Sequence, residues 1–396
     1  MVTLPDVIAL LVVQPTPFCN INCDYCYLPD RDSTARMVPA VFSELLRQVF
    51  ASGLAGRELS VIWHAGEPLV LPVDYYSAML GVIDELRIER SRFRHSIQTN
   101  GLLISDAWCR FIRDNDFHIG ISVDGPAFIH DRHRKDRQGK GTHDRVVRGM
   151  ERLHDHGIEF HAIAVVTADS LDFADEIIQF FVDNGVQRIG FNIDEQEGEN
   201  RRSSLVNPRL ETRIRKFWAR LYELQQSHEG LIHIREFESA YAAIMRSPVW
   251  LNADVAMGNN SQVSPLRILT VDWSGNLYTF SPELAGLKSV PYTDFCIGNI
   301  CRDSLPDLVR SEKLRRLTED IRAGVKMCAE ACEYFGLCGG GAPSNKYYEN
   351  GLFASAETAY CRATIQMPVD VVLADMETLT KSASNTATFA AYSNIP

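Results

Sequence analysis

Three cysteines stand within eight residues near the start of this 396-residue chain, in the pattern C-x3-C-x2-C at Cys19, Cys23 and Cys26. They follow a short apolar run, Val7–Val13, that is typical of a buried strand. A [4Fe–4S] cluster normally takes four cysteine thiolates, so three would leave one iron open to a substrate or cofactor. The alternative is zinc, but structural zinc sites usually close four ligands with paired C-x2-C motifs or histidines, and nothing nearby in sequence completes such a set.

Composition and charge exclude several classes of protein. The net charge of −11 argues against a nucleic-acid-binding surface. No apolar run approaches the roughly eighteen residues that a membrane helix needs, and Asp6 precedes the first apolar run where a signal peptide would be cationic. Ten cysteines without a secretion signal indicate the reducing cytoplasm, where clustered cysteines bind metal more often than they form disulfides. We therefore expect a cytoplasmic protein without nucleic-acid or membrane partners.

Strand-like and helix-like segments alternate through the first half of the chain. Runs rich in Val, Ile and Phe predict strands at Val7–Gln14, Leu59–His64, His95–Thr99, His118–Val123, Phe160–Val166 and Arg188–Ile193. Amphipathic stretches that end near Gly or Asn predict helices between them, at Pro39–Ser52, Val73–Ile88, Ser105–Asn115, Thr142–His156 and Leu171–Asn184. Repeated βα units require a parallel sheet covered by helices, so the predicted fold is α/β, a partial (β/α)6 barrel.

Polar motifs directly follow the predicted strands. The cysteine loop follows the first strand, and the next three strands are followed by Gly66-Glu67-Pro68, Thr99-Asn100-Gly101 and Ser122-Val123-Asp124-Gly125. In barrels of this kind the functional residues lie at the carboxyl ends of the strands. We therefore expect these motifs to face one site.

The second half of the chain predicts a helical bridge, a hairpin and a cysteine-rich segment. Trp218, Leu221 and Leu224 share one face of the bridge, and the hairpin covers Ile268–Phe280. The predicted division is a barrel core over 1–205, the helical bridge over 206–262, a cysteine-rich C-terminal domain over 263–382 that ends in a helix from Val369 to Ser382, and a flexible tail over 383–396.

The cysteine motif, with Tyr25 just before its last cysteine, resembles that of the radical S-adenosylmethionine (SAM) superfamily, whose core is a partial barrel. The resemblance implies that the open iron chelates the amino and carboxylate groups of SAM. It further implies that Glu67 holds the SAM amino group, that Ser122 faces the ribose or methionine part, and that Arg134 pairs with the carboxylate. The alternatives are a surface glutamate in a turn, a plain strand serine and a solvated basic loop. The cofactor-binding residues expected on this ground are Tyr25, Gly66, Glu67, Thr99, Asn100, Ser122 and Arg134.

A second cysteine set has the spacing Cys328-x3-Cys332-x5-Cys338-x22-Cys361, and four thiolates can saturate a cubane cluster. It resembles the SPASM extension of radical SAM peptide-modifying enzymes, which usually holds two auxiliary clusters. Two cysteine positions of the family's first auxiliary cluster fall here near Ser281 and at Ala342. The resemblance therefore implies one auxiliary [4Fe–4S] cluster, with a four-cysteine zinc site as the alternative. Whether Cys296 or Cys301 binds metal stays open, although core packing is favoured for Cys296.

Residues 277–284, 338–341 and 357–362 resemble the cyclophane-forming maturases of the GrrM/OscB type. That resemblance implies an enzyme that generates a 5′-deoxyadenosyl radical, abstracts a hydrogen from a β-carbon of a glycine-rich ribosomal precursor peptide, and joins that carbon to an aromatic ring. Rearomatisation releases one proton and one electron, for which the auxiliary cluster is the expected acceptor. An electron donor such as flavodoxin or ferredoxin is also implied.

Several points stay open at the level of sequence. Asp272 and Glu283 flank the hairpin and are weak candidates for a general base. The acidic run Asp194-Glu195-Gln196-Glu197 could bind a peptide cation or supply a base, but a solvated loop is favoured. Rival functions are a sulfatase-maturating or thioether-forming enzyme on the same scaffold, or a non-catalytic zinc or iron–sulfur scaffold protein.

Overall fold

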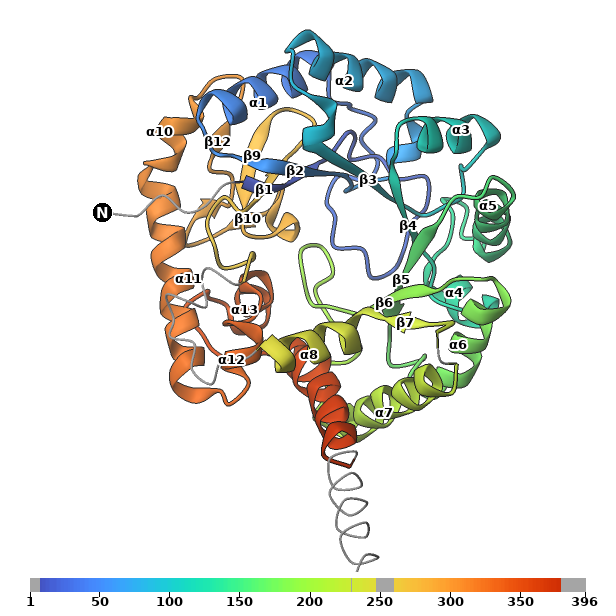
Figure 1. Ribbon diagram of the computed structural model, residues 1–396. Coiled ribbons are helices and arrows are strands. Elements are labelled where there is room, and N and C mark those ends of the chain that lie inside the picture. The colour runs from blue at the N-terminus through green and yellow to red at the C-terminus, as the bar shows by residue number, and fades with distance from the viewer. Residues whose placement is uncertain (1–7, 229, 247–259, 379–396) are drawn as a thin grey trace, which may run out of the picture.

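The computed structural model describes residues 8–228, 230–246 and 260–378. Its centre is a ten-stranded sheet with the strand order β12-β9-β8-β1-β2-β3-β4-β5-β6-β7, which curves into an open ring (Figure 1). The strands are β1 (Ile8–Val13), β2 (Ala55–Trp63), β3 (Phe93–Thr99), β4 (His118–Ser122), β5 (Phe160–Val166), β6 (Arg188–Ile193), β7 (His233–Ile234), β8 (Ile268–Val271), β9 (Asn276–Thr279) and β12 (Gly298–Asn299). Neighbours from β8 to β7 run parallel, and β9 and β12 are antiparallel additions.

Helices cover the outside of this ring (Figure 1). The described helices are α1 (Pro39–Ala51), α2 (Val73–Glu85), α3 (Asp106–Asp114), α4 (Ala127–His133), α5 (His143–Asp155), α6 (Ala174–Asp183), α7 (Glu211–Ser227), α8 (Arg235–Arg246), α10 (Leu305–Val309), α11 (Glu312–Ala331), α12 (Phe335–Cys338), α13 (Pro343–Asn350) and α14 (Ala359–Cys361). Short 3₁₀ turns are η1 (Pro68–Val70), η2 (Arg90–Arg92), η3 (Pro208–Leu210) and η4 (Pro282–Leu284), and a second, two-stranded sheet pairs β10 (Lys288–Ser289) with β11 (Thr293–Asp294). After α14 the chain makes a π-helical turn, η5 (Arg362–Gln366), and stays helical over 367–378.

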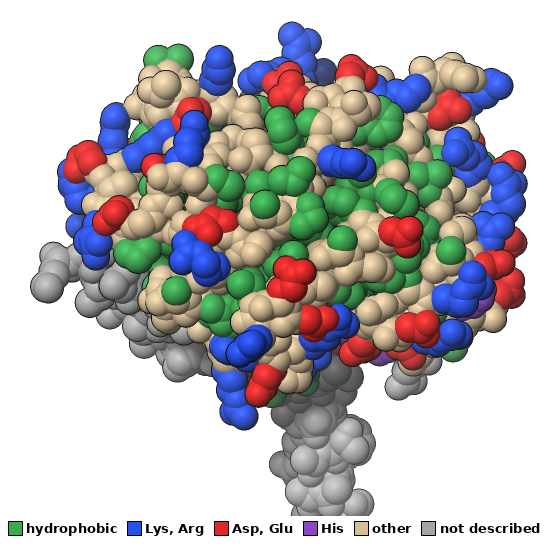
Figure 2. Space-filling view, turned by 90° about the horizontal axis from the view of Figure 1, so that it is seen from above, with side chains coloured by type: hydrophobic (Ala, Val, Ile, Leu, Met, Phe, Trp, Pro, Cys, Tyr) green, Lys and Arg blue, Asp and Glu red, His purple; other side chains and the backbone are tan. Residues whose placement is uncertain are grey.

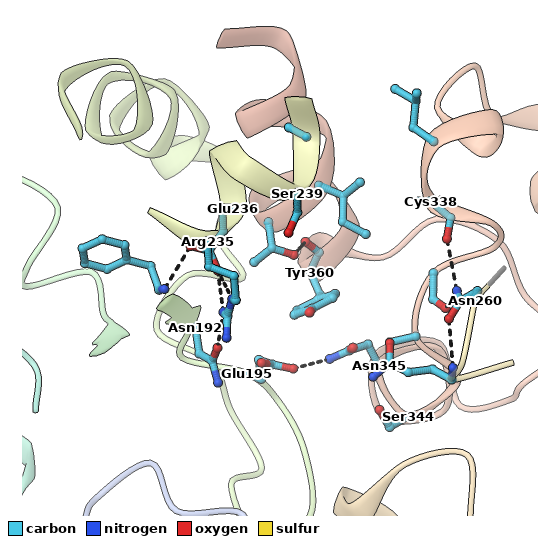
Figure 3. Close-up of a pocket in the computed structure, with 18 of the residues that line it drawn as sticks. Asn192, Glu195, Arg235, Glu236, Ser239, Asn260, Cys338, Ser344, Asn345 and Tyr360 are labelled. Atoms are coloured by element: carbon cyan, nitrogen blue, oxygen red, sulfur yellow. Dashed lines mark hydrogen bonds and ion pairs between the residues drawn. The ribbon is translucent and has the colours of Figure 1, made fainter. Parts of the chain in front are cut away.

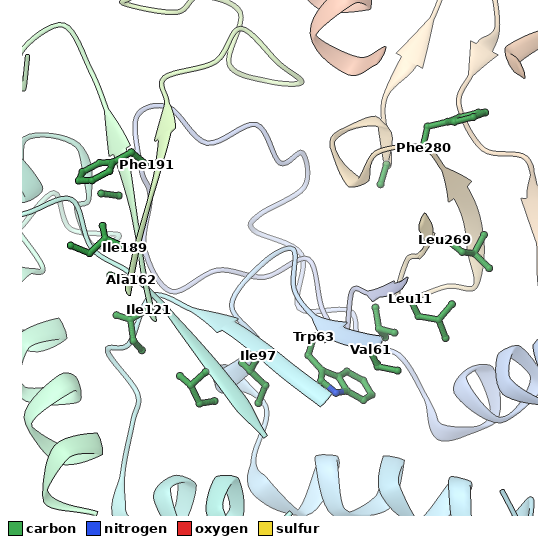
Figure 4. Close-up of a cluster of buried hydrophobic side chains, with 14 of the residues drawn as sticks. Leu11, Val61, Trp63, Ile97, Ile121, Ala162, Ile189, Phe191, Leu269 and Phe280 are labelled. Atoms are coloured by element: carbon green, nitrogen blue, oxygen red, sulfur yellow. The ribbon is translucent and has the colours of Figure 1, made fainter. Parts of the chain in front are cut away.

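The core lies between the sheet and the outer helices. Large side chains from neighbouring strands, among them Trp63, Ile97 and Ile121, form one buried cluster (Figure 4). The Trp63 ring lies 5.2 Å from the ring of Phe42 on α1 and 5.2 Å from that of Tyr76 on α2, so one side chain ties both helices to β2. Truncating a buried side chain of this size typically costs about 3–5 kcal/mol, and this packing fixes the strand ends that carry the polar motifs.

Figure 2 shows one face of the molecule, on which basic and acidic side chains are interspersed, mostly towards the edge. This face therefore carries no continuous acidic patch, although the net charge of the chain is negative. Among the described residues, none of the helices combines the length and the apolar character that crossing a bilayer requires.

The six predicted strands and five predicted barrel helices are confirmed, with ends that differ by a few residues. The sequence did not indicate α4 or β7. The predicted hairpin is confirmed as β8 and β9, and β8 pairs in parallel with β1 (Leu10 opposite Ile268), so it extends the barrel sheet. The domain boundary at residue 263 stays a prediction.

The predicted helical bridge contains α7 and α8, with β7 between them. Trp218, Leu221 and Leu224 are buried as expected, and Trp218 Nε1 donates a hydrogen bond of 2.6 Å to the Ala363 carbonyl. This contact joins the bridge to the last helix, which begins about ten residues earlier than the sequence predicted. The rest of the predicted bridge, 247–259, and the predicted tail lie outside the described residues.

Candidate active site

A cavity of about 290 Å³ lies at the carboxyl ends of the barrel strands. Every residue predicted for the first site lines it: Cys19, Cys23, Tyr25, Cys26, Gly66, Glu67, Thr99, Asn100, Ser122 and Arg134. The structure thus brings together residues that are spread over more than a hundred positions of sequence. The role of each residue stays a prediction.

The segment that follows α4 holds the cysteine loop in place. Backbone amides of Asn22 and Asp24 donate to the carbonyls of Lys135 (2.7 Å) and His133 (3.1 Å). The Arg137 guanidinium donates to the Cys19 carbonyl at 2.9 Å. The loop is therefore fixed by backbone contacts, which leaves its side chains free to act as ligands.

The three thiols of this loop suit a multi-iron cluster. Burial, together with the nearby Glu67 carboxylate, raises the pKa of Cys19 to about 12, and burial raises that of Cys23 to about 11, so both thiols hold their protons until a metal displaces them. Within the described ranges, no three Cys, His, Asp or Glu side chains are placed to hold a single metal ion. A mononuclear zinc site needs such a set, whereas a cubane takes its thiolates on separate irons.

Glu67 joins the ends of β2 and β3 inside the cavity. Its Oε1 accepts hydrogen bonds from the Leu69 amide (2.9 Å) and the Thr99 hydroxyl (2.6 Å), and its Oε2 accepts one from the Asn100 amide (2.8 Å). Burial raises the pKa of Glu67 to about 7 despite these donors. A carboxylate can accept about four hydrogen bonds, so Oε2 can still accept one from a ligand. Glu67 is buried, and the alternative of a surface glutamate is wrong.

Gly66 allows the cysteine loop to approach β2. Its φ is +96°, and a Cβ at this position would lie 2.2 Å from the Thr16 carbonyl oxygen and 2.9 Å from that of Phe18. The preceding residue, Ala65, has a φ of +66°, which explains why a glycine is favourable there too.

Changing Gly66 to alanine should destabilise the protein, by at least about 1–2 kcal/mol for the backbone conformation alone. The clash with the Thr16 carbonyl adds to this and displaces the cysteine loop, so iron incorporation should also fall. The matched variant Ala65→Gly should be no less stable than the wild type, because glycine relieves a left-handed conformation. Thermal unfolding followed by circular dichroism checks both; equal midpoints for Gly66→Ala and wild type would contradict the account.

Arg134 forms a buried ion pair with Asp124. Its Nε and Nη2 each lie 2.9 Å from a carboxylate oxygen, and Asp124 also accepts hydrogen bonds from the Tyr25 hydroxyl and, at 2.9 Å, from the Val165 amide. Burial opposes the charge of Asp124, but the Arg134 guanidinium holds the pKa of that carboxyl below its usual range. Only Nη1 of Arg134 turns towards Cys23, with 4.0 Å between Nη1 and Sγ. The alternative of a solvated basic loop is therefore wrong for Arg134.

Ser122 and Asn100 complete the polar rim of the cavity. Ser122 Oγ accepts a hydrogen bond of 2.9 Å from Gln98, and Asn100 Nδ2 lies 2.7 Å from Asn20 Oδ1 and 3.9 Å from Cys19 Sγ. Asn100 thus connects the turn after β3 to the cysteine loop.

A larger cavity of about 610 Å³ adjoins the first, between the barrel and the C-terminal segment (Figure 3). Four residues line both cavities, so the two spaces meet: Asn192, Glu195, Glu197 and Glu283. Cys338 lines the far wall, where the side chain of Asn260 donates to its carbonyl at 3.1 Å. We call the joined space the chamber.

The four C-terminal cysteines lie close together beyond this wall. Burial raises the pKa of Cys338 to about 11, and the nearby Cys361 and Cys332 raise it further. Burial and the nearby Cys328 likewise raise the pKa values of Cys332 and Cys361. Lys346, which the sequence did not single out, is buried and lies with its Nζ 3.1 Å from Cys328 Sγ. An ammonium in this position would favour the thiolate form of Cys328, which is the form that binds metal.

Three further cysteines lie outside the two sets, and whether Cys296 or Cys301 binds metal stays open. Cys109 is fully buried, as expected of a core residue. Cys296 packs partly against the core and donates to the Gly298 carbonyl at 3.2 Å, and Cys301 is exposed.

The two candidates for a base are placed differently. Asp272 accepts hydrogen bonds from the backbone and side chains of Ser274 and Asn276 at 2.8–3.0 Å, so it shapes the β8–β9 turn. Glu283 lines the chamber and accepts a hydrogen bond from the Ser281 hydroxyl. Only Glu283 is therefore placed to reach a ligand in this space.

The acidic run after β6 is not the solvated loop that the sequence favoured; that expectation is wrong. Asp194 and Glu197 are 6% and 4% exposed. The loop is covered because the C-terminal segment packs on it: Gln196 donates to the Tyr348 carbonyl at 2.9 Å, and Asn345 donates to Glu195 at 2.7 Å. These contacts are far apart in sequence, which is why local composition could not indicate them.

Comparison with known proteins agrees with this architecture. Residues 13–181 match the model of the radical SAM superfamily. An uncharacterized protein of Synechocystis sp. is 40% identical over 372 residues, covering 93% of this chain and 92% of that protein. A serine-type anaerobic sulfatase-maturating enzyme of Klebsiella aerogenes is 34% identical over 184 residues, 46% of this chain and 45% of that enzyme.

Two solved structures share the fold. Native anSMEcpe with bound AdoMet has a TM-score of 0.72 at 20% identity, covering 95% of this chain and 100% of that one. Streptococcus suis SuiB bound to precursor peptide SuiA has a TM-score of 0.64 at 17% identity, covering 90% of this chain and 76% of that one. With the family match and a relative that aligns over nearly the whole length, these findings show that the chain belongs to the radical SAM superfamily, enzymes that use a [4Fe–4S] cluster and S-adenosylmethionine.

Proposed function

We propose that this enzyme modifies a ribosomally synthesised, glycine-rich precursor peptide by joining a side-chain β-carbon to an aromatic ring. The observation that carries the proposal is the chamber, which runs from the cysteine loop of the barrel to the wall that contains Cys338. A peptide there would lie between both cysteine sets. The precursor peptide bound to SuiB and the substrates named for the sulfatase-maturating relatives support a polypeptide substrate.

The residues that would hold the cofactors follow from the two cysteine sets. Cys19, Cys23 and Cys26 would hold the first [4Fe–4S] cluster, with SAM among Glu67, Ser122 and Arg134; the auxiliary cluster would take Cys328, Cys332, Cys338 and Cys361. When bound, these groups supply a 5′-deoxyadenosyl radical for hydrogen abstraction and an acceptor for one electron. An electron donor of the flavodoxin or ferredoxin type and a cytoplasmic location belong to the same proposal.

The chain's own part is to position the peptide and to accept a proton. Forming the carbon–carbon bond removes one hydrogen atom from the β-carbon, and then one proton and one electron from the ring. Glu283 would take this proton, because it lines the chamber and burial raises the pKa of its carboxyl above the usual value, which makes it a stronger base.

The proposal is tested by co-expressing the enzyme with a small glycine-rich precursor encoded beside its gene. We expect the peptide to lose the mass of two hydrogens without any involvement of cysteine, and the purified enzyme to contain about eight irons per chain. A product with formylglycine together with about twelve irons would favour a sulfatase-maturating function instead. A bond to a cysteine sulfur would favour thioether formation, and protein that fails to cleave SAM with dithionite would favour a scaffold. Any of these would overturn the proposal.

A further inference from the structure

We propose that the chamber recognises a positively charged side chain of the peptide, a lysine ammonium or an arginine guanidinium, through the carboxylates of Glu195 and Glu197, which lie beside Glu283. The inference rests on the proposed function, since it specifies the class of peptide that the chamber accepts. It predicts a lysine or arginine close in sequence to the crosslinked residues.

The three carboxylates come from two separate segments and converge on the chamber. Glu195 and Glu197 lie on the loop after β6, and Glu283 lies in the turn after β9. All three line both cavities. Glu197 is 4% exposed, and its Oε1 has no hydrogen-bond partner among the described residues. A buried carboxylate oxygen without a partner is costly, so a ligand that donates to it is expected.

Arg235 is a cation near these glutamates, and it partly offsets the rise that burial causes in the pKa of Glu195 without pairing with it. In the described parts of the chain, none of the three glutamates forms an ion pair with a lysine or arginine. Arg235 lines the larger cavity, but its guanidinium is held by Glu236 (Nε to Oε1 2.8 Å) and by Asn192 Oδ1 (2.8 Å; Figure 3). Buried charges are normally paired, and here the partner would come with the substrate.

A side-chain cation fits this place better than a metal ion does. No three of the acidic side chains in the described ranges are arranged to hold one ion. Tyr360 shares the wall of the larger cavity with Glu195 (Figure 3), and an aromatic face beside a carboxylate favours an organic cation. Burial raises the pKa of Glu195 to about 8 and that of Glu197 well above its usual value, and a cation beside them would favour their charged forms.

The position of a bound cation would be fixed relative to the cysteine loop. Glu199 N donates to the Tyr27 carbonyl at 2.9 Å, and a Cβ at Gly198 would lie 2.3 Å from the same oxygen. Tyr27 directly follows Cys26. A peptide anchored at Glu197 would therefore present its neighbouring residues at a constant offset from the reacting site.

The test measures binding of blocked pentapeptides, Ac-Gly-Phe-Gly-X-Gly-NH2, to the anaerobically reconstituted full-length enzyme with SAM, by ligand-observed NMR. With X as lysine or arginine we expect binding about tenfold tighter than with X as glutamine or norleucine, a typical effect of one charge-assisted contact. Glu197→Gln and Glu195→Gln should each remove most of this preference. Glu199→Gln, an exposed residue of the same loop, is the matched control and should retain it.

Equal binding of charged and neutral peptides by the wild-type enzyme would overturn the inference, and this measurement does not depend on whether any variant folds. A preference that survives in Glu197→Gln would overturn it as well. Because binding is measured without turnover, a cation preference in an enzyme that forms no crosslink would contradict the proposed function alone. Crosslinking without a cation preference would contradict this inference alone.

Discussion

Changing Cys328 and Cys361 together to alanine should reduce crosslinked peptide to background while SAM is still cleaved. These two cysteines lie beyond the far wall of the chamber, and neither lines the barrel cavity. On the proposed function these cysteines hold the cluster that accepts the electron of rearomatisation, so deoxyadenosine should form without product. Iron should fall from about eight to about four per chain.

The matched control is Cys301→Ala, which changes an exposed cysteine outside the chamber. It should alter neither iron content nor product, which also settles whether Cys301 binds metal. Product and deoxyadenosine are measured by mass spectrometry and liquid chromatography on the same reaction. A double variant that still forms crosslinked peptide with about eight irons would show that Cys328 and Cys361 hold no cluster.

The barrel and its site could be predicted from sequence because the signals are local. Each βα unit carries its own apolar periodicity, and each polar motif stands directly after its strand, so topology alone brings Cys19, Glu67 and Ser122 together. Gly66 could likewise be predicted as part of the site, although only the structure shows that the Thr16 carbonyl leaves no room for a side chain there.

The chamber could not be predicted because it depends on contacts between distant segments. Glu197 belongs to a run that looks solvated, and it is buried because residues near 345, about 150 positions later, cover its loop. Lys346 gives no local signal either, since an isolated lysine is usually exposed. The ion pair between Arg134 and Asp124 could not be predicted either. The resemblance indicated Arg134, but its partner became evident only because the fold brings the end of β4 next to the residue after α4.

The cysteine loop of the barrel is expected to hold the cluster at which SAM is cleaved. The largest effect is therefore expected from changing Cys19, Cys23 and Cys26 together to alanine. These side chains line the barrel cavity, and backbone hydrogen bonds rather than the thiols hold the loop, so the fold should survive. The variant should keep about four irons per chain at the C-terminal cysteines.

The most direct measurement is deoxyadenosine release by this triple variant, reconstituted anaerobically and supplied with SAM and dithionite. The account predicts release at the background of a reaction without enzyme, beside ready formation by the wild type. Deoxyadenosine from the triple variant at the wild-type level would contradict the account.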